Sequence, residues 1–233
     1  MKNFTIIIPI FNEIDSIFNL LDEIKKEFDG QLPEIIIVDD GSTDNFVKKK
    51  IEFKKNNLKV IHHKKNLGKC KAMLTGVKNA KKKNICIIDG DGQNPPYEAK
   101  KLMNFWMNIN KTEKQFALIC GNRIKRQDSM SKKISSKVAN KIRKIMLDDD
   151  CDDTACALKV FSKDDYLKLK YFRNMHRFLP ALFKINSGKI FNVPVDDRKR
   201  TKGFSKYSFH NRFWIGILDL INVWLMVLKR RKK

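Results

Sequence analysis

Short apolar runs separated by helical patterns constrain the fold of this chain most. The runs FTIIIPI at 4–10, EIIIVDD at 34–40 and ICIIDGD at 85–91 are rich in isoleucine and apolar over most of their length. Strands of this kind are buried on both faces, as in a parallel sheet. A stretch with helical spacing separates the first two runs, and its apolar residues are Ile14, Ile17, Leu21, Ile24 and Phe28. The sequence therefore predicts an α/β fold, with helices on both faces of a mixed, mostly parallel sheet.

The same alternation predicts the remaining elements. Up to residue 122 the pattern is clear, and the further expected elements are strands at 58–63 and 116–122 and helices at 69–80 and 97–108. Beyond that point the pattern loosens, and the expected elements are helices at 131–146 and 171–184 and strands at 155–161 and 189–195. No internal repeat and no linker rich in Gly, Ser or Pro divides the chain. We therefore expect one domain over residues 1–208 and a C-terminal helix over 209–233.

The last segment, FHNRFWIGILDLINVWLMVLKRRKK, is an apolar helical pattern that ends in five successive cations. Its mostly apolar part, residues 213–228, would form a helix about 24 Å long, which is shorter than the roughly 30 Å hydrocarbon layer of a bilayer. We therefore do not expect it to span a membrane. Two placements stay open: the amphipathic helix packs its apolar face on the domain, or it lies in a membrane interface with Lys229–Lys233 on lipid phosphates.

Charge and cysteine usage limit the partners and the compartment. The formal net charge is +23, and the 49 lysines and arginines are spread along the whole chain. Such a charge favours an anionic partner, which leaves nucleic acid, an anionic membrane surface and a phosphorylated small molecule open. Genome composition is the alternative explanation for part of the lysine excess. Five cysteines without a Cys-x-x-Cys spacing indicate a reduced, cytoplasmic protein without structural zinc. The N-terminus is expected to be a first strand and not a signal peptide.

Acidic side chains follow three of the expected strands. They are Glu13 after the first strand, Asp39, Asp40 and Asp44 after the second, and Asp89 with Asp91 after the fourth. The carboxyl ends of parallel strands meet at one edge, where ligands bind. Carboxylates gathered there repel one another unless a cation or hydrogen-bond donors lie between them, and oxygen ligands favour Mg²⁺ or Mn²⁺. The alternative is that the Asp-Gly pairs form turns, which explains one pair better than three at successive strand ends.

The histidines carry weaker signals. His62 and His63 follow the third strand and are expected to be solvated loop residues. His176 lies in the sequence MHRF, where a position beside a substrate channel and a purely structural hydrogen bond are both open.

Seven motifs, taken together, resemble family 2 glycosyltransferases. In chain order they are PIFNE, VDDGSTD, NLGKCKAMLTG, DGDGQNPP, DTACALKVF, HRF and RKRTKGFSKY. The set is most similar to the branch of dolichyl-phosphate mannosyltransferases and undecaprenyl-phosphate sugar transferases, and it covers nearly the full chain. The Asp-x-Asp element alone is a weak signal, whereas the ordered set is specific. The resemblance implies a GT-A fold, which is Rossmann-like and binds a nucleotide-sugar.

The resemblance assigns residues to a donor site. The donor-binding positions that it implies are Pro9, Phe11, Glu13, Asp39, Asp40 and Lys69. The positions that it implies for a Mg²⁺ or Mn²⁺ ion on the donor diphosphate are Asp89, Asp91 and Gln93. A divalent ion would stabilise the negative charge that develops on the departing phosphate. Phe11 replaces the tyrosine of many relatives, which removes a hydroxyl but keeps a ring that can stack on a base.

The resemblance also places an anionic acceptor beside cations of the second half. The catalytic positions that it implies are Asp91, Arg123, Asp153, Arg200 and Lys206, with Ser205 and Tyr207 ordering the loop. Arginine suits phosphate because its planar fork binds two oxygens. Asp153 would orient the acceptor loop, and a turn or cap role is the open alternative. Ala155 replaces a usual glycine, which makes a positive-φ turn there less certain.

These features predict an inverting, metal-dependent enzyme that moves a sugar from a GDP- or UDP-linked donor to undecaprenyl or dolichyl phosphate. It would act peripherally on the cytoplasmic face of a membrane, and a homo-oligomer stays open. One alternative is transfer to a lipid or saccharide hydroxyl in cell-envelope glycan synthesis, which would require a general base. The remote alternatives are an inactive membrane scaffold and a basic nucleic-acid-binding protein. We expect no nucleic-acid partner, because three strand ends are acidic.

Overall fold

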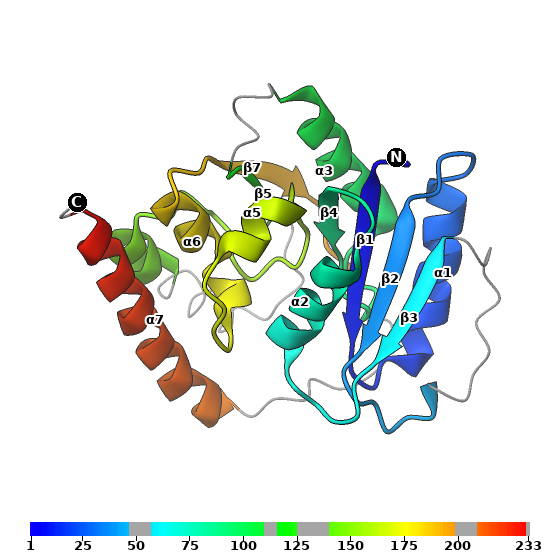
Figure 1. Ribbon diagram of the computed structural model, residues 1–233, viewed down its shortest axis with the longest axis horizontal. Helices are drawn as coiled ribbons and strands as arrows, with labels where there is room; N and C mark the ends of the chain where they lie inside the picture. Colours follow the sequence, from blue (N-terminus) through cyan, green and yellow to red (C-terminus); the bar gives the residue numbers. More distant parts are fainter. Residues whose placement is uncertain (47–56, 110–115, 125–139, 199–208, 232–233) are drawn as a thin grey trace.

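The computed structural model describes residues 1–46, 57–109, 116–124, 140–198 and 209–231. Its centre is a seven-stranded sheet with the order β3-β2-β1-β4-β6-β5-β7 (Figure 1). The strands are β1 (Phe4–Ile10), β2 (Glu34–Asp39), β3 (Leu58–His62), β4 (Asn84–Ile87), β5 (Leu118–Arg123), β6 (Lys159–Ser162) and β7 (Ile190–Val195). Neighbouring strands pair in parallel except at β6, which runs antiparallel to both β4 and β5. The predicted mixed, mostly parallel sheet is confirmed.

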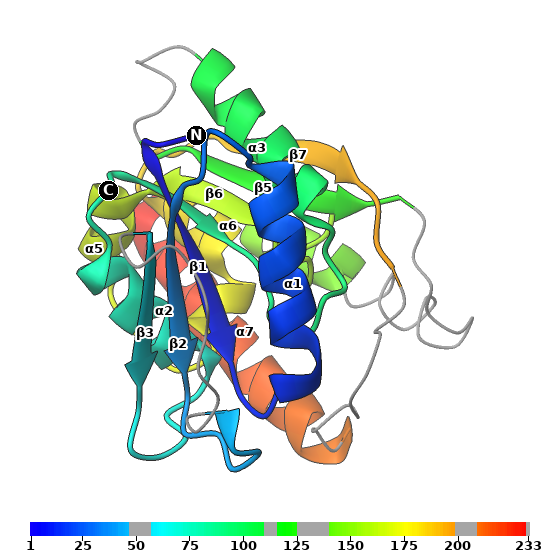
Figure 2. The same cartoon turned by 90° about the vertical axis from the view of Figure 1, so that its right-hand side faces the viewer.

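Successive residues of the apolar strands pack on opposite sides of the sheet. In β1, Ile6 and Ile8 belong to one buried cluster and Ile7 belongs to another. The first cluster is covered by α1 (Ile14–Glu27) and α3 (Pro96–Asn108), and the second by α2 (Lys69–Asn79), α5 (Lys163–Lys168) and α6 (Leu179–Ile185) (Figure 2). Both faces of the sheet are therefore buried, which explains why the strands are apolar throughout.

Glycine and proline fix the starts of the two helices that border the carboxyl ends of the strands. α2 begins after Gly68, whose φ of 90° favours glycine. α3 begins with Pro96, at a position where the missing N–H costs no helical hydrogen bond. Both helices agree with the predictions for 69–80 and 97–108. The first residue of α2, Lys69, is thereby placed at the edge of the sheet.

The second half differs from the prediction in two places. The sequence predicts one helix over 171–184, but the structure has a short 3-10 helix, η3 (Met175–Arg177), followed by α6. Asn174 has a left-handed φ of 67°, which an α-helix does not allow, so the predicted single helix is wrong. The short helix α5 is not anticipated by the sequence. Residues 140–147 are helical, and the rest of the helix predicted over 131–146 lies outside the described residues.

The C-terminal helix α7 (Phe209–Arg231) packs on the domain along one face. Val223 and Val227 are buried in a cluster with Leu147, Phe178 and Ala181. The opposite face is apolar but uncovered, with exposed fractions of 63% for Leu218, 40% for Ile221 and 46% for Leu225. Among the helices in the described ranges, none has the length and apolar character needed to cross a bilayer. Of the two placements that the sequence leaves open, packing on the domain is thus observed for one face.

Candidate active site

The carboxyl ends of β1, β2 and β4 are joined by direct hydrogen bonds. The Ser16 hydroxyl, in the first turn of α1, donates to the carbonyl of Gly90 at 2.8 Å. The backbone N–H of Asn12 donates to the Ser42 hydroxyl at 2.8 Å. A Cβ on Gly90 would lie 2.4 Å from Cγ2 of Ile10, so only glycine permits this approach. The loops that carry Glu13, Asp39 and Asp89 therefore meet at one edge of the sheet.

Two histidines bind the aspartates at the end of β2. Nδ1 of His62 lies 3.0 Å from Oδ2 of Asp39, and Nδ1 of His63 lies 2.7 Å from Oδ1 of Asp40. Nε2 of His63 also contacts the Thr75 hydroxyl on α2 at 3.0 Å. The prediction of solvated loop histidines is wrong for His63, whose side chain is 9% exposed. Asp39 of β2 and His62 of β3 are partners in the parallel pairing of the two strands. The sequence alone does not give this register.

Asp40 organises the turn that leads into α2. Its Oδ1 accepts the backbone N–H of Leu67 at 2.9 Å, and its Oδ2 accepts that of Gly68 at 2.7 Å. Together with the His63 contact, these hydrogen bonds engage both oxygens of the Asp40 side chain, which is 4% exposed. The contacts of Asp40 that the structure shows therefore serve the turn, and the donor-binding role that the resemblance implies for this residue stays a prediction.

The other predicted donor-binding residues that follow or lie in β1 and β2 differ in their exposure. Asp39 is 1% exposed, and its Oδ1 accepts the N–H of Ser42 at 3.0 Å. Pro9 is buried inside β1 beside Val38 of β2. Phe11 and Glu13 are half-buried in the connection from β1 to α1. Phe11 and Glu13 are thus the more accessible members of this predicted set.

A lysine holds the first aspartate of the Asp-x-Asp motif. Nζ of Lys69 lies 2.6 Å from Oδ1 of Asp89 and donates to Oδ2 at 2.8 Å. Burial would lower the pKa of Lys69, but the charge of Asp89, and more weakly that of Asp91, raises it overall. Asp91 is half-buried, and its Oδ1 accepts the backbone N–H of Gln93 at 3.1 Å. The structure therefore brings together the three predicted metal positions and Lys69.

The oxygen ligands after β4 fit a divalent ion that the substrate helps to bind. Within the described ranges, no three His, Cys, Asp or Glu side chains come together as a metal-binding group, so the acidic strand ends do not form one carboxylate cluster. Mg²⁺ in proteins commonly takes one or two carboxylates and completes its shell with water and substrate phosphates. Asp89 and Asp91, with the amide oxygen of Gln93, are oxygen ligands of that kind.

The predicted acceptor residue Arg123, at the end of β5, is bound by two carboxylates. Its Nε and one terminal nitrogen donate to the two oxygens of Asp153 at 2.6 and 3.1 Å. Its other terminal nitrogen lies 3.5 Å from Asp197. Burial would lower the pKa of Arg123, but the hydrogen bonds and charge of Asp153 raise it well above its usual range. Asp153 thus binds Arg123 through two hydrogen bonds, and such bidentate ion pairs are stronger than pairs with a single hydrogen bond.

The segment after β7 connects Arg123 to the Asp-x-Asp loop. The residue after Asp197, Arg198, donates its backbone N–H to the carbonyl of Gln93 at 3.1 Å. Its guanidinium donates to the carbonyl of Gly92 and, at 2.7 Å, to Glu23. The basic sequence RKRTKGFSKY therefore begins beside the predicted metal loop. The predicted phosphate ligands Arg200 and Lys206, with Ser205 and Tyr207, lie outside the described residues.

A buried arginine that the sequence does not single out supports the Asp153 loop. Nε of Arg143 lies 2.8 Å from Oδ2 of Asp149, which is fully buried. Its terminal nitrogens donate to the Thr154 hydroxyl and the Cys151 carbonyl. Burial raises the pKa of Asp149, and the Arg143 charge opposes that shift. Arg143 thus holds the loop from both sides of Asp153, although in sequence it is one cation among many.

His176 and Cys70 connect η3 to the start of α2. The Cys70 thiol lies 3.0 Å from Nδ1 of His176 and accepts its backbone N–H at 3.2 Å. Burial raises the pKa of Cys70 above its ordinary value, so this thiol stays protonated. The structural hydrogen bond that the sequence leaves open for His176 is therefore present, one residue away from Lys69.

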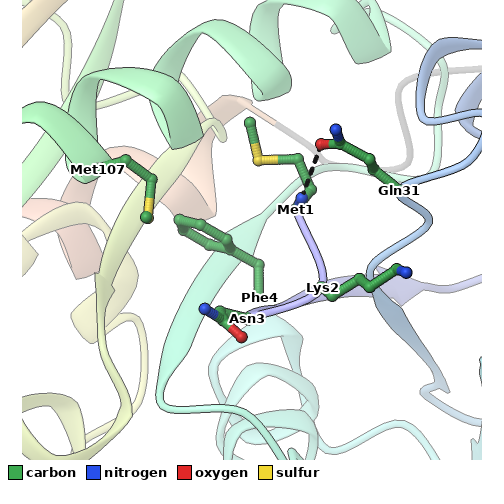
Figure 3. A pocket seen from close by; sticks show the side chains of 6 residues that line it. All are labelled: Met1, Lys2, Asn3, Phe4, Gln31 and Met107. Carbon is green, nitrogen blue, oxygen red and sulfur yellow. Dashed lines mark hydrogen bonds between the residues drawn. The ribbon is translucent and has the colours of Figure 1, made fainter.

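A pocket of about 450 Å³ lies elsewhere, at the amino end of β1 (Figure 3). Its lining residues are Met1, Lys2, Asn3, Phe4, Gln31 and Met107. The only hydrogen bond drawn between them joins the Met1 amino group to the Gln31 side chain at 3.1 Å. Because β1 runs from Phe4 to Ile10, this pocket is at the opposite end of the strand from the acidic edge.

The chain is similar to known proteins in sequence and in fold. Residues 5–170 match the family model of glycosyl transferase family 2. A dodecaprenyl-phosphate galacturonate synthase from Rhizobium johnstonii is 29% identical over 227 residues, which cover 94% of this chain and 65% of that protein. The chain thus spans about two thirds of the length of that relative.

Solved structures show the same fold. Glucosyl-3-phosphoglycerate synthase from Mycobacterium tuberculosis with UDP matches at a TM-score of 0.67 and 16% identity, over 98% of this chain and 80% of that one. The same protein with Mn²⁺, UDP and glucosyl-3-phosphoglycerate matches at a TM-score of 0.68 with the same identity and coverage. The predicted GT-A fold is confirmed. With a family match over more than half of its length, the chain belongs to glycosyl transferase family 2.

Proposed function

We propose that this glycosyltransferase carries out an inverting, metal-dependent transfer of a sugar from a GDP- or UDP-linked donor to a polyprenyl phosphate. The observation that carries this proposal is the connection between two chemically different groups. Asp89 and Asp91 lie at the end of β4, and Asp197 and Arg198 join their loop to the Arg123–Asp153 pair. The predicted metal loop is thereby tied to Arg123 and to the start of the basic segment, whose further cations would receive the second anion.

Donor binding would use the acidic edge of the sheet. Asp91, with Asp89 and Gln93, would hold the ion, and Phe11 would stack on the base. When bound, Mg²⁺ or Mn²⁺ would stabilise the charge on the departing diphosphate. Glucosyl-3-phosphoglycerate synthase, which has the same fold, was crystallised with UDP and either Mn²⁺ or Mg²⁺, which supports a donor of this kind.

The acceptor phosphate would attack the anomeric carbon directly. A phosphate oxygen forms the new bond to that carbon while the bond to the diphosphate oxygen breaks, which inverts the configuration. An anionic phosphate needs no general base, whereas a hydroxyl acceptor does. Asp153 is engaged by Arg123 through both oxygens and is 4% exposed, which disfavours it as a base. The Rhizobium relative is named for a polyprenyl-phosphate product, which supports the same acceptor class.

A lipid acceptor requires contact with a bilayer, and α7 offers a surface for it. Leu218, Ile221 and Leu225 are exposed on one face of the helix, and the exposed Lys229 follows one turn later. An apolar stripe beside cations suits the interface of an anionic leaflet. We therefore infer peripheral attachment to the cytoplasmic face of a membrane through this face of α7.

The proposal is tested by incubating purified protein with undecaprenyl phosphate, Mn²⁺ or Mg²⁺, and a panel of UDP- and GDP-sugars that includes a uronic acid. Mass spectrometry of the lipid fraction should show a polyprenyl-phosphate sugar with one donor. The Asp91→Asn variant should lose about 100-fold or more in rate, because the ion loses a charged ligand at the developing charge.

The matched control is Asp22→Asn, which removes one exposed carboxylate from α1 and should keep the wild-type rate. Equal rates for Asp91→Asn and wild type would overturn the metal role. A sugar product on a lipid hydroxyl, with none on the phosphate, would overturn the acceptor class.

A further inference from the structure

The fold holds Lys69 in a defined position. It is the first residue of α2, directly after Gly68, whose backbone N–H is bound by Asp40. Asp40 is held in turn by His63, which also contacts Thr75 of the same helix. These contacts fix the start of α2, and they thereby position the Lys69 side chain beside Asp89.

The ammonium group of Lys69 contacts both oxygens of Asp89, at 2.6 and 2.8 Å. Asp89 and Asp91 are two residues apart, so their charges repel when no cation is present. Lys69 cancels one of these charges. The two side chains of the pair are 30% and 29% exposed, so water screens the interaction only in part.

The number of charged ligands sets how strongly a protein binds a divalent ion. With Lys69 on Asp89, the motif carries a net charge near −1 in place of −2. A free ion then gains little from the protein alone, whereas a diphosphate adds negative charge and oxygen ligands of its own.

We propose that Lys69 is the built-in counter-ion of Asp89, which keeps the Asp-x-Asp motif from binding a free divalent cation, so that the ion is recruited together with the donor diphosphate. This inference rests on the proposed metal-dependent donor site. It makes Lys69 a positioning residue that orders ion and nucleotide binding.

The test measures Mn²⁺ binding directly, by the loss of the free Mn²⁺ signal in electron paramagnetic resonance. Wild type and Lys69→Met are titrated without nucleotide and with saturating UDP or GDP. Without nucleotide, Lys69→Met should bind Mn²⁺ about tenfold more tightly than wild type, because the competing ammonium is gone. Lys69→Arg, which keeps the charge, should behave as wild type. Wild type should bind Mn²⁺ tightly only with nucleotide.

The matched control is Lys78→Met, which removes an exposed lysine from the other end of α2 and should leave both titrations unchanged. Circular dichroism verifies that each variant is folded, and Lys69→Gln is the second neutral variant should Lys69→Met fail that check. Equal nucleotide-free affinities of wild type and the folded neutral variant would overturn this inference while the donor site stands. Absence of Mn²⁺ binding to wild type even with both nucleotides would overturn the metal-dependent function itself.

Discussion

At Arg123, one guanidinium holds carboxylates from two distant segments. Asp153 lies before β6 and Asp197 lies after β7, and both are 5% exposed in their side chains. A guanidinium is always charged, so the two acidic groups can be buried near each other. The loop before β6 and the start of the basic segment are thus both bound by Arg123.

Replacement of Arg123 by methionine should cost about 3 kcal/mol of unfolding free energy, because it leaves buried carboxylates without their cation. Urea unfolding of the variant measures this loss. The matched control is Lys144→Met, which breaks the neighbouring pair with Asp152, whose side chains are 43% and 47% exposed. It should cost less than about 1 kcal/mol. Equal losses of unfolding free energy in the two variants would show that Arg123 does not stabilise the buried carboxylates.

Residue types at strand ends could be predicted from the sequence, but their partners could not. Acidic residues after apolar runs indicated the edge of the sheet where we propose the donor site, and the structure places Asp89 and Asp91 there. The pairing of Asp39 with His62 depends on the register of β2 and β3, and the Arg123–Asp153 pair joins residues thirty positions apart. No local pattern specifies such contacts, because they form only when the sheet is assembled.

Among the elements, α7 has two apolar faces with different surroundings. Val223 is fully buried and Val227 is 8% exposed, against the domain. Asn174 donates to Asp219 of α7 at 3.0 Å, which fixes the helix beside η3. The inner face therefore contributes to folding stability, and the outer face does not.

Val223→Ala should lower the unfolding free energy by about 2 kcal/mol, because it removes buried methyl groups and leaves a cavity. Leu225→Ala, on the exposed face of the same helix, should change it by less than about 0.5 kcal/mol. Thermal and urea unfolding of both variants give the comparison. If Leu225→Ala were the more costly change, the packing of α7 described above would be wrong.

Elements with strong patterns were predictable and weakly patterned ones were not. Continuous apolar runs identified β1, β2 and β4, because a strand that is buried on both faces is apolar at successive positions. The helix predicted over 171–184 failed because one residue, Asn174, takes a left-handed conformation that propensity alone does not reveal. Contacts between His176 of η3 and Cys70 of α2 hold the short helix in place.

For the whole molecule, the net charge of +23 and the outer face of α7 act in the same direction. Electrostatic attraction brings a cationic protein to an anionic leaflet, and apolar side chains then insert into the interface. The membrane attachment that we propose uses both contributions, so both should be visible in binding experiments.

Sedimentation with vesicles of phosphatidylglycerol and phosphatidylcholine should show binding that weakens as salt rises, because salt screens the charges. The double variant Leu218→Ser with Leu225→Ser should bind about tenfold more weakly. The matched control, Met107→Ser with Leu167→Ser, removes exposed apolar side chains of similar accessibility from α3 and α5 and should bind as wild type. If all three proteins bound the vesicles equally, the exposed face of α7 would not be the membrane contact.

The reversed direction of β6 has a consequence for how two substrates can be accommodated. Because β6 runs against β4 and β5, the chain enters it at the same edge at which those strands end. Its incoming loop, with Asp153, thus lies at that edge, and β6 stands between the strands that carry the Asp-x-Asp turn and Arg123. Two strand spacings separate those features, or about 10 Å. A single inverted strand therefore sets how far apart the Asp-x-Asp turn and Arg123 stand, and with them the donor and acceptor sites that we propose.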